Sequence, residues 1–145
     1  MDNLCIDTVV DFSSKAYPES YKILFMTETY SVDVTEDDLQ YAIFAIIKSC
    51  NLRCRWCFEN SESESRVKPL TTEQIISIIR KLKGLRGINI SGGEASLHPD
   101  ILPILLETKQ ACTDPHLLSN GVSLQERILH FLAAENIRLT GSLDG

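Results

Sequence analysis

From residue 41 onward, short apolar segments alternate with longer segments of helical periodicity. The apolar segments are YAIFAIIK (41–48), GINIS (87–91), PHLLS (115–119) and IRLTGSLDG (137–145). Between them, apolar residues recur every three to four positions, as on one face of a helix. Short strands that alternate with helices pair in parallel through right-handed crossovers. We therefore expect an α/β fold of about four parallel strands and three helices, either an open sheet or part of a barrel.

Capping signals mark where the three helices begin. Thr71 and Gln74 have the spacing of a capping box at the start of the first helix. Asp100 is a good N-cap for the second helix, DILPILLETKQA. Ser123 and Glu126 repeat the capping-box spacing at the start of the third.

The first 40 residues differ from the rest of the chain. Residues 1–49 carry nine acidic and three basic side chains, which accounts for the whole net charge of −6. The remaining residues carry equal numbers of each sign, so no basic stripe for a nucleic-acid backbone is expected. The segment YKILFMTETYSVDV (21–34) has the composition of a strand pair. We divide the chain into an N-terminal lead-in, 1–40, and a core, 41–145.

The five cysteines indicate a reduced protein rather than a disulfide scaffold. Their number is odd, and three of them cluster in CNLRCRWCF (50–58). Disulfide scaffolds use even, distributed cysteines in secreted chains. No apolar run approaches the roughly 18 residues of a membrane span. We therefore expect a cytoplasmic protein without a membrane partner.

Polar or glycine-rich residues follow each expected strand. The first strand leads into the cysteine cluster, and the next three lead into SGGE (91–94), SNG (119–121) and SLDG (142–145). The carboxyl ends of parallel strands meet at one edge of a sheet, where active groups gather. The sequence therefore predicts a single site at this edge.

Three clustered thiols are typical ligands of zinc or of an iron–sulfur cluster. A structural zinc ion needs a fourth ligand, for which His98 is better placed than His116 or His130. Zinc leaves SGGE and SLDG without a role. A cube of four irons held by three cysteines instead keeps one iron open for a chelating molecule. Gly92 and Gly93 then allow close approach of the backbone, and Glu94 can accept a hydrogen bond from an ammonium group.

These motifs resemble those of the radical S-adenosylmethionine (radical SAM) superfamily. The cysteines follow its C-x3-C-x2-C pattern with an aromatic residue, Trp56, before the third cysteine. Gly92, Gly93 and Glu94 match its glycine–glycine–glutamate turn, although Ala95 stands where the family commonly has proline. LLSNG and GSLDG are similar to its third and fourth strand ends. The resemblance covers residues 41–145, the N-terminal portion of the core domain.

The resemblance implies two cofactors and a set of binding positions. Cys50, Cys54 and Cys57 would hold three irons of a 4Fe–4S cluster, and SAM would chelate the fourth. The positions near SAM would be Trp56, Gly92, Gly93, Glu94, Ser119, Asn120, Ser142 and Asp144. An electron from the cluster would cleave SAM to methionine and a 5′-deoxyadenosyl radical, which abstracts hydrogen from a substrate. No catalytic residue is assigned beyond these positions.

The resemblance also implies partners. The family's barrel has six βα units, so a chain with four strands looks truncated, with an open edge at its last strand. We expect the N-terminal segment, self-association or a partner chain to cover that edge. The electron donor would be a flavodoxin or ferredoxin, and the substrate would belong to peptide modification or cofactor biosynthesis. The alternatives are a non-catalytic iron–sulfur or zinc module and a truncated remnant.

Overall fold

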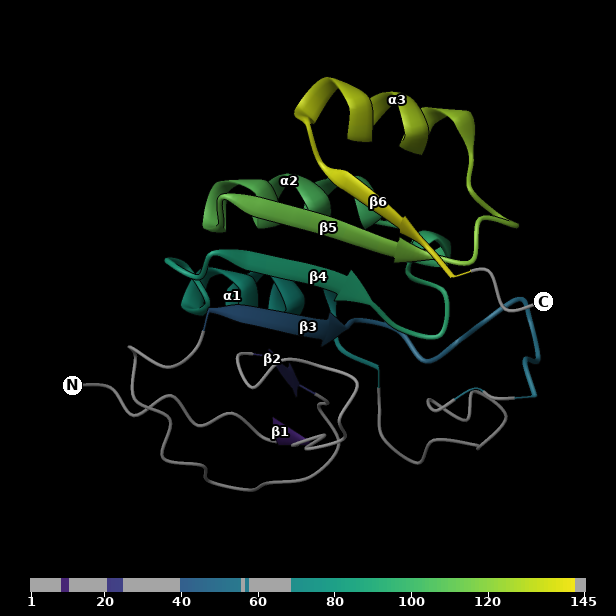
Figure 1. Ribbon diagram of the computed structural model, residues 1–145, viewed down its shortest axis with the longest axis horizontal. Coiled ribbons are helices and arrows are strands. Elements are labelled where there is room, and N and C mark those ends of the chain that lie inside the picture. The colour runs from purple at the N-terminus through teal and green to yellow at the C-terminus, as the bar shows by residue number, and fades with distance from the viewer. Residues whose placement is uncertain (1–8, 11–20, 25–39, 56, 58–68, 143–145) are drawn as a thin grey trace.

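The fold is known from a computed structural model, which describes residues 9–10, 21–24, 40–55, 57 and 69–142. Within these residues the strands form one six-stranded sheet in the order β1-β2-β3-β4-β5-β6 (Figure 1). The strands are β1 (Val9–Val10), β2 (Tyr21–Leu24), β3 (Tyr41–Ala45), β4 (Gly87–Ser91), β5 (Asp114–Ser119) and β6 (Arg138–Gly141). From β2 to β6 all neighbours are parallel, and β1 is antiparallel to β2. The predicted α/β fold is confirmed: β3 to β6 alternate with three helices.

The helices and strands form two layers. The helices are α1 (Thr72–Lys81), α2 (Ile101–Ala111) and α3 (Glu126–Glu135). Figure 1 shows α1 and α2 side by side behind the sheet, and α3 packs beside α2. Side chains alternate between the two faces of β3 and β5, so Phe44 and Leu117 are fully buried. They belong to the same hydrophobic core as Ile79 of α1 and Ile104 of α2.

The observed N-caps of the helices agree only in part with those predicted from the sequence. Thr71 and Gln74 form the predicted capping box: the Gln74 N–H donates to Thr71 Oγ1 at 3.3 Å, and the Thr71 N–H donates to Gln74 Oε1 at 2.9 Å. Asp100 is the N-cap of α2, but its side chain makes no cap bond. The capping box predicted at Ser123 is wrong: the N-cap of α3 is Gln125, and no side chain caps it.

The N-terminal strands extend the sheet at an unexpected edge. β2 runs beside β3, with Tyr21 opposite Tyr41 and Leu24 opposite Phe44. The expectation that this segment covers the edge of the last strand is therefore wrong for its two described strands. Among the described residues β6 remains an outer strand of the sheet, opposite β1, and all four of its residues are exposed. Residues 25–34 of the predicted strand pair lie outside the described residues, and the division of the chain at residue 40 stays a prediction.

The described helices are all too short or too polar to cross a lipid bilayer. The longest of them, α2, has 11 residues, whereas a membrane span needs about 20.

Candidate functional site

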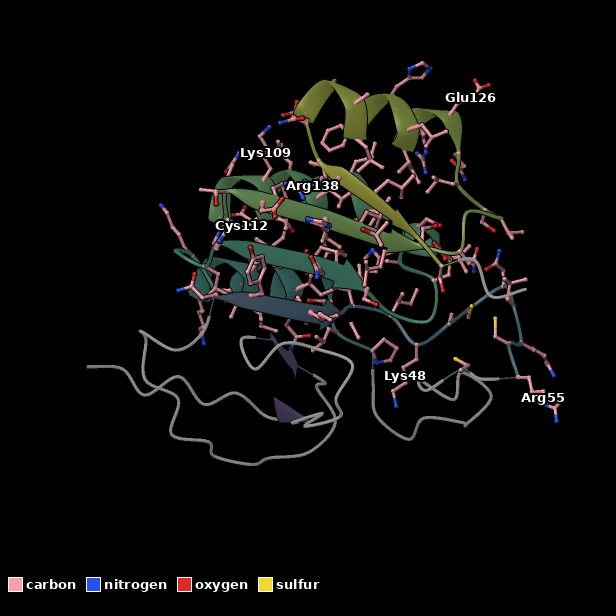
Figure 2. The ribbon with its side chains drawn as sticks, in the orientation of Figure 1. Lys48, Arg55, Lys109, Cys112, Glu126 and Arg138 are labelled. Atoms are coloured by element: carbon pink, nitrogen blue, oxygen red, sulfur yellow. The ribbon has the colours of Figure 1, made fainter. Side chains whose placement is uncertain are left out.

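The carboxyl ends of the strands place the predicted groups at one edge of the sheet. Figure 2 shows Lys48 and Arg55, which flank the first two cysteines, on the side where the strand arrows end. Cys112 lies at the opposite end of the sheet. Its buried thiol donates to the carbonyl of Thr108 at 3.3 Å, and burial raises its pKa. Cys112 is therefore a packing residue, distant from the cysteine cluster.

The glycine pair holds the beginning of the cysteine loop against the end of β4. The N–H of Gly93 donates to the carbonyl of Ile47 at 2.7 Å, and that of Glu94 donates to Ser49 at 2.9 Å. A Cβ atom at Gly92 would collide with the carbonyl of Ile47, and one at Gly93 with that of Ser49. The two glycines are thus required by a close approach of two backbone segments within the protein itself.

Glu94 is a buried carboxylate at the centre of the site. Its side chain is 1% exposed. Oε1 accepts hydrogen bonds from Ser96 N at 3.1 Å, Ser96 Oγ at 2.5 Å and Ser119 Oγ at 2.8 Å. Oε2 accepts one, from Asn120 N at 2.7 Å. None of the ion pairs recorded in the described part of the chain involves Glu94. The carboxylate therefore ties the end of β4 to the end of β5.

Asn120 extends this network to the cysteine loop. Its Nδ2 donates to Asn51 Oδ1 at 2.8 Å and lies 3.8 Å from the sulfur of Cys50. Its Oδ1 accepts from Val122 N at 3.0 Å. Asn51 in turn donates to Ser123 Oγ at 2.5 Å. Polar side chains thus join the ends of β3 and β5 directly.

The three cysteines lie on one loop as free thiols. Cys50 and Cys57 are half-buried and Cys54 is exposed. Cys50 Sγ accepts from the N–H of Leu52 at 3.4 Å, and the N–H of Cys57 donates to the carbonyl of Cys54 at 3.1 Å. In the part of the chain that is described, no three His, Cys, Asp or Glu side chains are gathered closely enough for a single metal ion.

The other predicted positions are distributed as follows. Ser142 follows β6, and its N–H donates to the carbonyl of Ser119 at 3.0 Å. Trp56 and Asp144 lie outside the described residues. His98, considered as a zinc ligand, is buried in the turn before α2. Its Nδ1 accepts from Asp100 N at 3.1 Å, and burial lowers its pKa.

Sequence reasoning missed three residues of the site: Asn51, Ser96 and Ser123. Ser96 carries a local signal, because an acidic residue two positions before a serine at a turn can accept the serine N–H. Glu94 makes this bond as the N-cap of the short 3-10 helix η1 (Ala95–Leu97). Asn51 and Ser123 carry no comparable signal, since they meet across 72 positions of sequence.

The order of these groups along the chain matches a known family. The protein-family model described as "Radical SAM superfamily" matches residues 44–145 of the sequence. The chain belongs to the radical SAM superfamily. The resemblance found in the sequence is therefore confirmed.

Several relatives of this radical SAM protein have names that state an activity. GTP 3′,8-cyclase of Microcystis aeruginosa is 28% identical over 116 residues, or 74% of this chain and 35% of the relative. Probable GTP 3′,8-cyclase of Methanococcus maripaludis is 31% identical over 69% of this chain and 35% of the relative. GTP 3′,8-cyclase 1 of Mycobacterium tuberculosis is 33% identical over 111 residues, which cover 69% of this chain and 31% of the relative. The chain spans about a third of the length of these relatives.

Proposed function

We propose that this chain is the cofactor-binding portion of a radical SAM enzyme, with Cys50, Cys54 and Cys57 holding a 4Fe–4S cluster. Three thiols on one loop suit such a cluster and leave one iron free for SAM. The bound cluster would supply an electron for the cleavage of SAM to methionine and a 5′-deoxyadenosyl radical, which would abstract hydrogen from a substrate. The support is the membership of the superfamily together with the free state of the three thiols.

The observation that carries the proposal is the buried carboxylate of Glu94. A buried charge is costly unless hydrogen bonds and an opposite charge compensate it. Four hydrogen bonds reach Glu94, but three of them converge on Oε1. Oε2 accepts a single bond from Asn120 and keeps acceptor capacity. An ammonium group, such as that of the methionine part of SAM, would supply the positive charge that no ion pair among the described residues gives to Glu94.

The rest of the edge has a supporting role in this proposal. Gly92 and Gly93 keep the cysteine loop against β4, so that the thiols and Glu94 share one edge. Ser119 and Asn120 fix the carboxylate. Trp56, Ser142 and Asp144 are assigned to SAM by the family pattern alone.

The substrate and the electron donor belong to the same proposal. A flavodoxin or ferredoxin would deliver the electron in a reducing cytoplasm, which agrees with the free thiols. The relatives named GTP 3′,8-cyclase favour a small-molecule substrate over a peptide. Most of each relative lies beyond the matched region, so the substrate contacts are expected outside residues 41–145.

Anaerobic reconstitution with iron and sulfide tests the proposal. We expect about four irons and four sulfides per chain, as in a 4Fe–4S cluster. Cys54→Ala should abolish uptake, whereas Cys112→Ala is the matched control and should retain it, since Cys112 lies at the other end of the sheet. One tightly bound zinc ion without iron uptake would favour the zinc module instead.

A further inference from the structure

Asn120 contacts both parts of the site, the Glu94 carboxylate and the sulfur of Cys50. Its backbone N–H donates to Glu94 Oε2 at 2.7 Å. Its side-chain nitrogen lies 3.8 Å from Cys50 Sγ, within reach of an N–H···S hydrogen bond, although 70 positions separate the two residues. The same residue therefore connects the proposed ammonium-binding carboxylate with a proposed cluster ligand.

The orientation of the Asn120 carboxamide is fixed by its neighbours. Oδ1 accepts from the backbone N–H of Val122, which can only donate. Turning the amide over would place its NH₂ group against that N–H and remove the donor from the sulfur. One hydrogen of Nδ2 serves Asn51 Oδ1 at 2.8 Å, so the other is available to Cys50.

We propose that Asn120 is a positioning residue that raises the reduction potential of the cluster by donating a hydrogen bond to the Cys50 sulfur. This inference rests on the proposed function. Hydrogen bonds to the sulfurs are among the determinants of an iron–sulfur cluster's potential. Reduction adds negative charge to the cluster and its thiolates, which strengthens a bond from a fixed N–H donor. The reduced form therefore gains more from Asn120 than the oxidised form.

The backbone N–H of Leu52, 3.4 Å from the same sulfur, acts in the same direction. It belongs to the cysteine loop and moves with it. Asn120 instead approaches from the end of β5, where Glu94 holds its backbone. The bond to Cys50 thus depends on the packing of two strand ends.

The test compares redox titrations of the reconstituted full chain and three variants. Asn120→Ala removes the donor. Asn120→Asp has nearly the same shape and can still accept from Val122, but it offers the sulfur no N–H and adds a negative charge, so Asn120→Ala is the variant that isolates the hydrogen bond. Ser123→Ala is the matched control, because it breaks the neighbouring bond to Asn51 and leaves the donor to Cys50 in place.

At a fixed solution potential we expect the ratio of reduced to oxidised cluster to fall about tenfold in Asn120→Ala, or about 59 mV for one electron. The ratio should fall at least as far in Asn120→Asp, because its added negative charge also disfavours the reduced cluster. Ser123→Ala should titrate as wild type, and all variants should keep their iron content. Equal titrations of all four proteins, or a shift in Ser123→Ala as large as in Asn120→Ala, would overturn the inference. So would Asn120 variants that fold but take up no iron. A wild-type chain without a cluster would overturn both this inference and the proposed function.

Discussion

Glu94 was predicted from its motif, but its hydrogen-bond partners were not. The motif Gly92–Gly93–Glu94 pointed to this carboxylate, and the structure places it at the centre of the predicted edge. Its donors Ser119 and Asn120 were predicted as members of the site, but not as partners of Glu94. That pairing is a tertiary contact across 25 and 26 positions, for which the sequence carries no periodic signal.

At this scale we predict that Glu94→Ala lowers the free energy of unfolding by about 2–4 kcal/mol. The substitution leaves buried donors of Ser96, Ser119 and Asn120 without an acceptor, and each such group is costly. Chemical denaturation of the metal-free chain measures the change. Glu126→Ala, at an exposed position in the first turn of α3, is the control and should change it by less than about 1 kcal/mol. A loss below about 0.5 kcal/mol for Glu94→Ala would contradict the described network.

At the scale of helices and strands, type and order were predictable, and boundaries only in part: β4 spans the predicted residues 87–91, whereas other elements differ from the prediction. Apolar periodicity located all three helices and β3 to β6. The first predicted strand, 41–48, ends at Ala45, because beyond it the backbone bonds to the turn after β4: Ile47 accepts from Gly93 N. Capping motifs compete with tertiary contacts in the same way. Ser123 bonds to Asn51 across the site and does not cap α3.

The cap of α1 gives the element-scale prediction. Thr71→Ala removes the side-chain acceptor of Gln74 N, which is one of the two hydrogen bonds of the capping box, and this should cost about 1 kcal/mol of stability. Gln125→Ala, at the N-cap of α3 where no side-chain bond exists, should cost less than about 0.5 kcal/mol. Thermal or urea unfolding of the two variants measures this difference. Equal losses would show that the Thr71 cap contributes nothing.

At the scale of the whole molecule, the parallel strands β3 to β6 have one edge covered by the N-terminal strands and one edge, at β6, without a described strand beside it. All four residues of β2, Tyr21–Leu24, pair with β3 and so cover one edge of it. Among the described strands, β6 pairs only with β5. Exposed strand edges promote association. The sequence indicated that residues 1–40 contain strand-forming segments, but not which edge they join, because pairing partners are set by the assembled sheet.

Removing residues 1–40 should therefore increase self-association. The deletion uncovers β3, whose Ala42 and Phe44 are buried in the core and whose backbone then loses the β2 partner. Light scattering coupled to size-exclusion chromatography compares the full chain with residues 41–145 at equal concentration. The edge at β6 is common to both proteins, so a difference reports on β3. A monomeric, cooperatively folding 41–145 fragment would refute this account of the N-terminal strands.

The central claim is that Cys50, Cys54 and Cys57 hold a cluster whose open iron binds SAM. The most direct test is the electron paramagnetic resonance spectrum of the reduced, reconstituted chain with and without SAM. We predict that SAM changes the spectrum, because its amino and carboxylate groups would become ligands of the open iron. An unchanged spectrum at saturating SAM, in a chain that holds four irons, would contradict the claim.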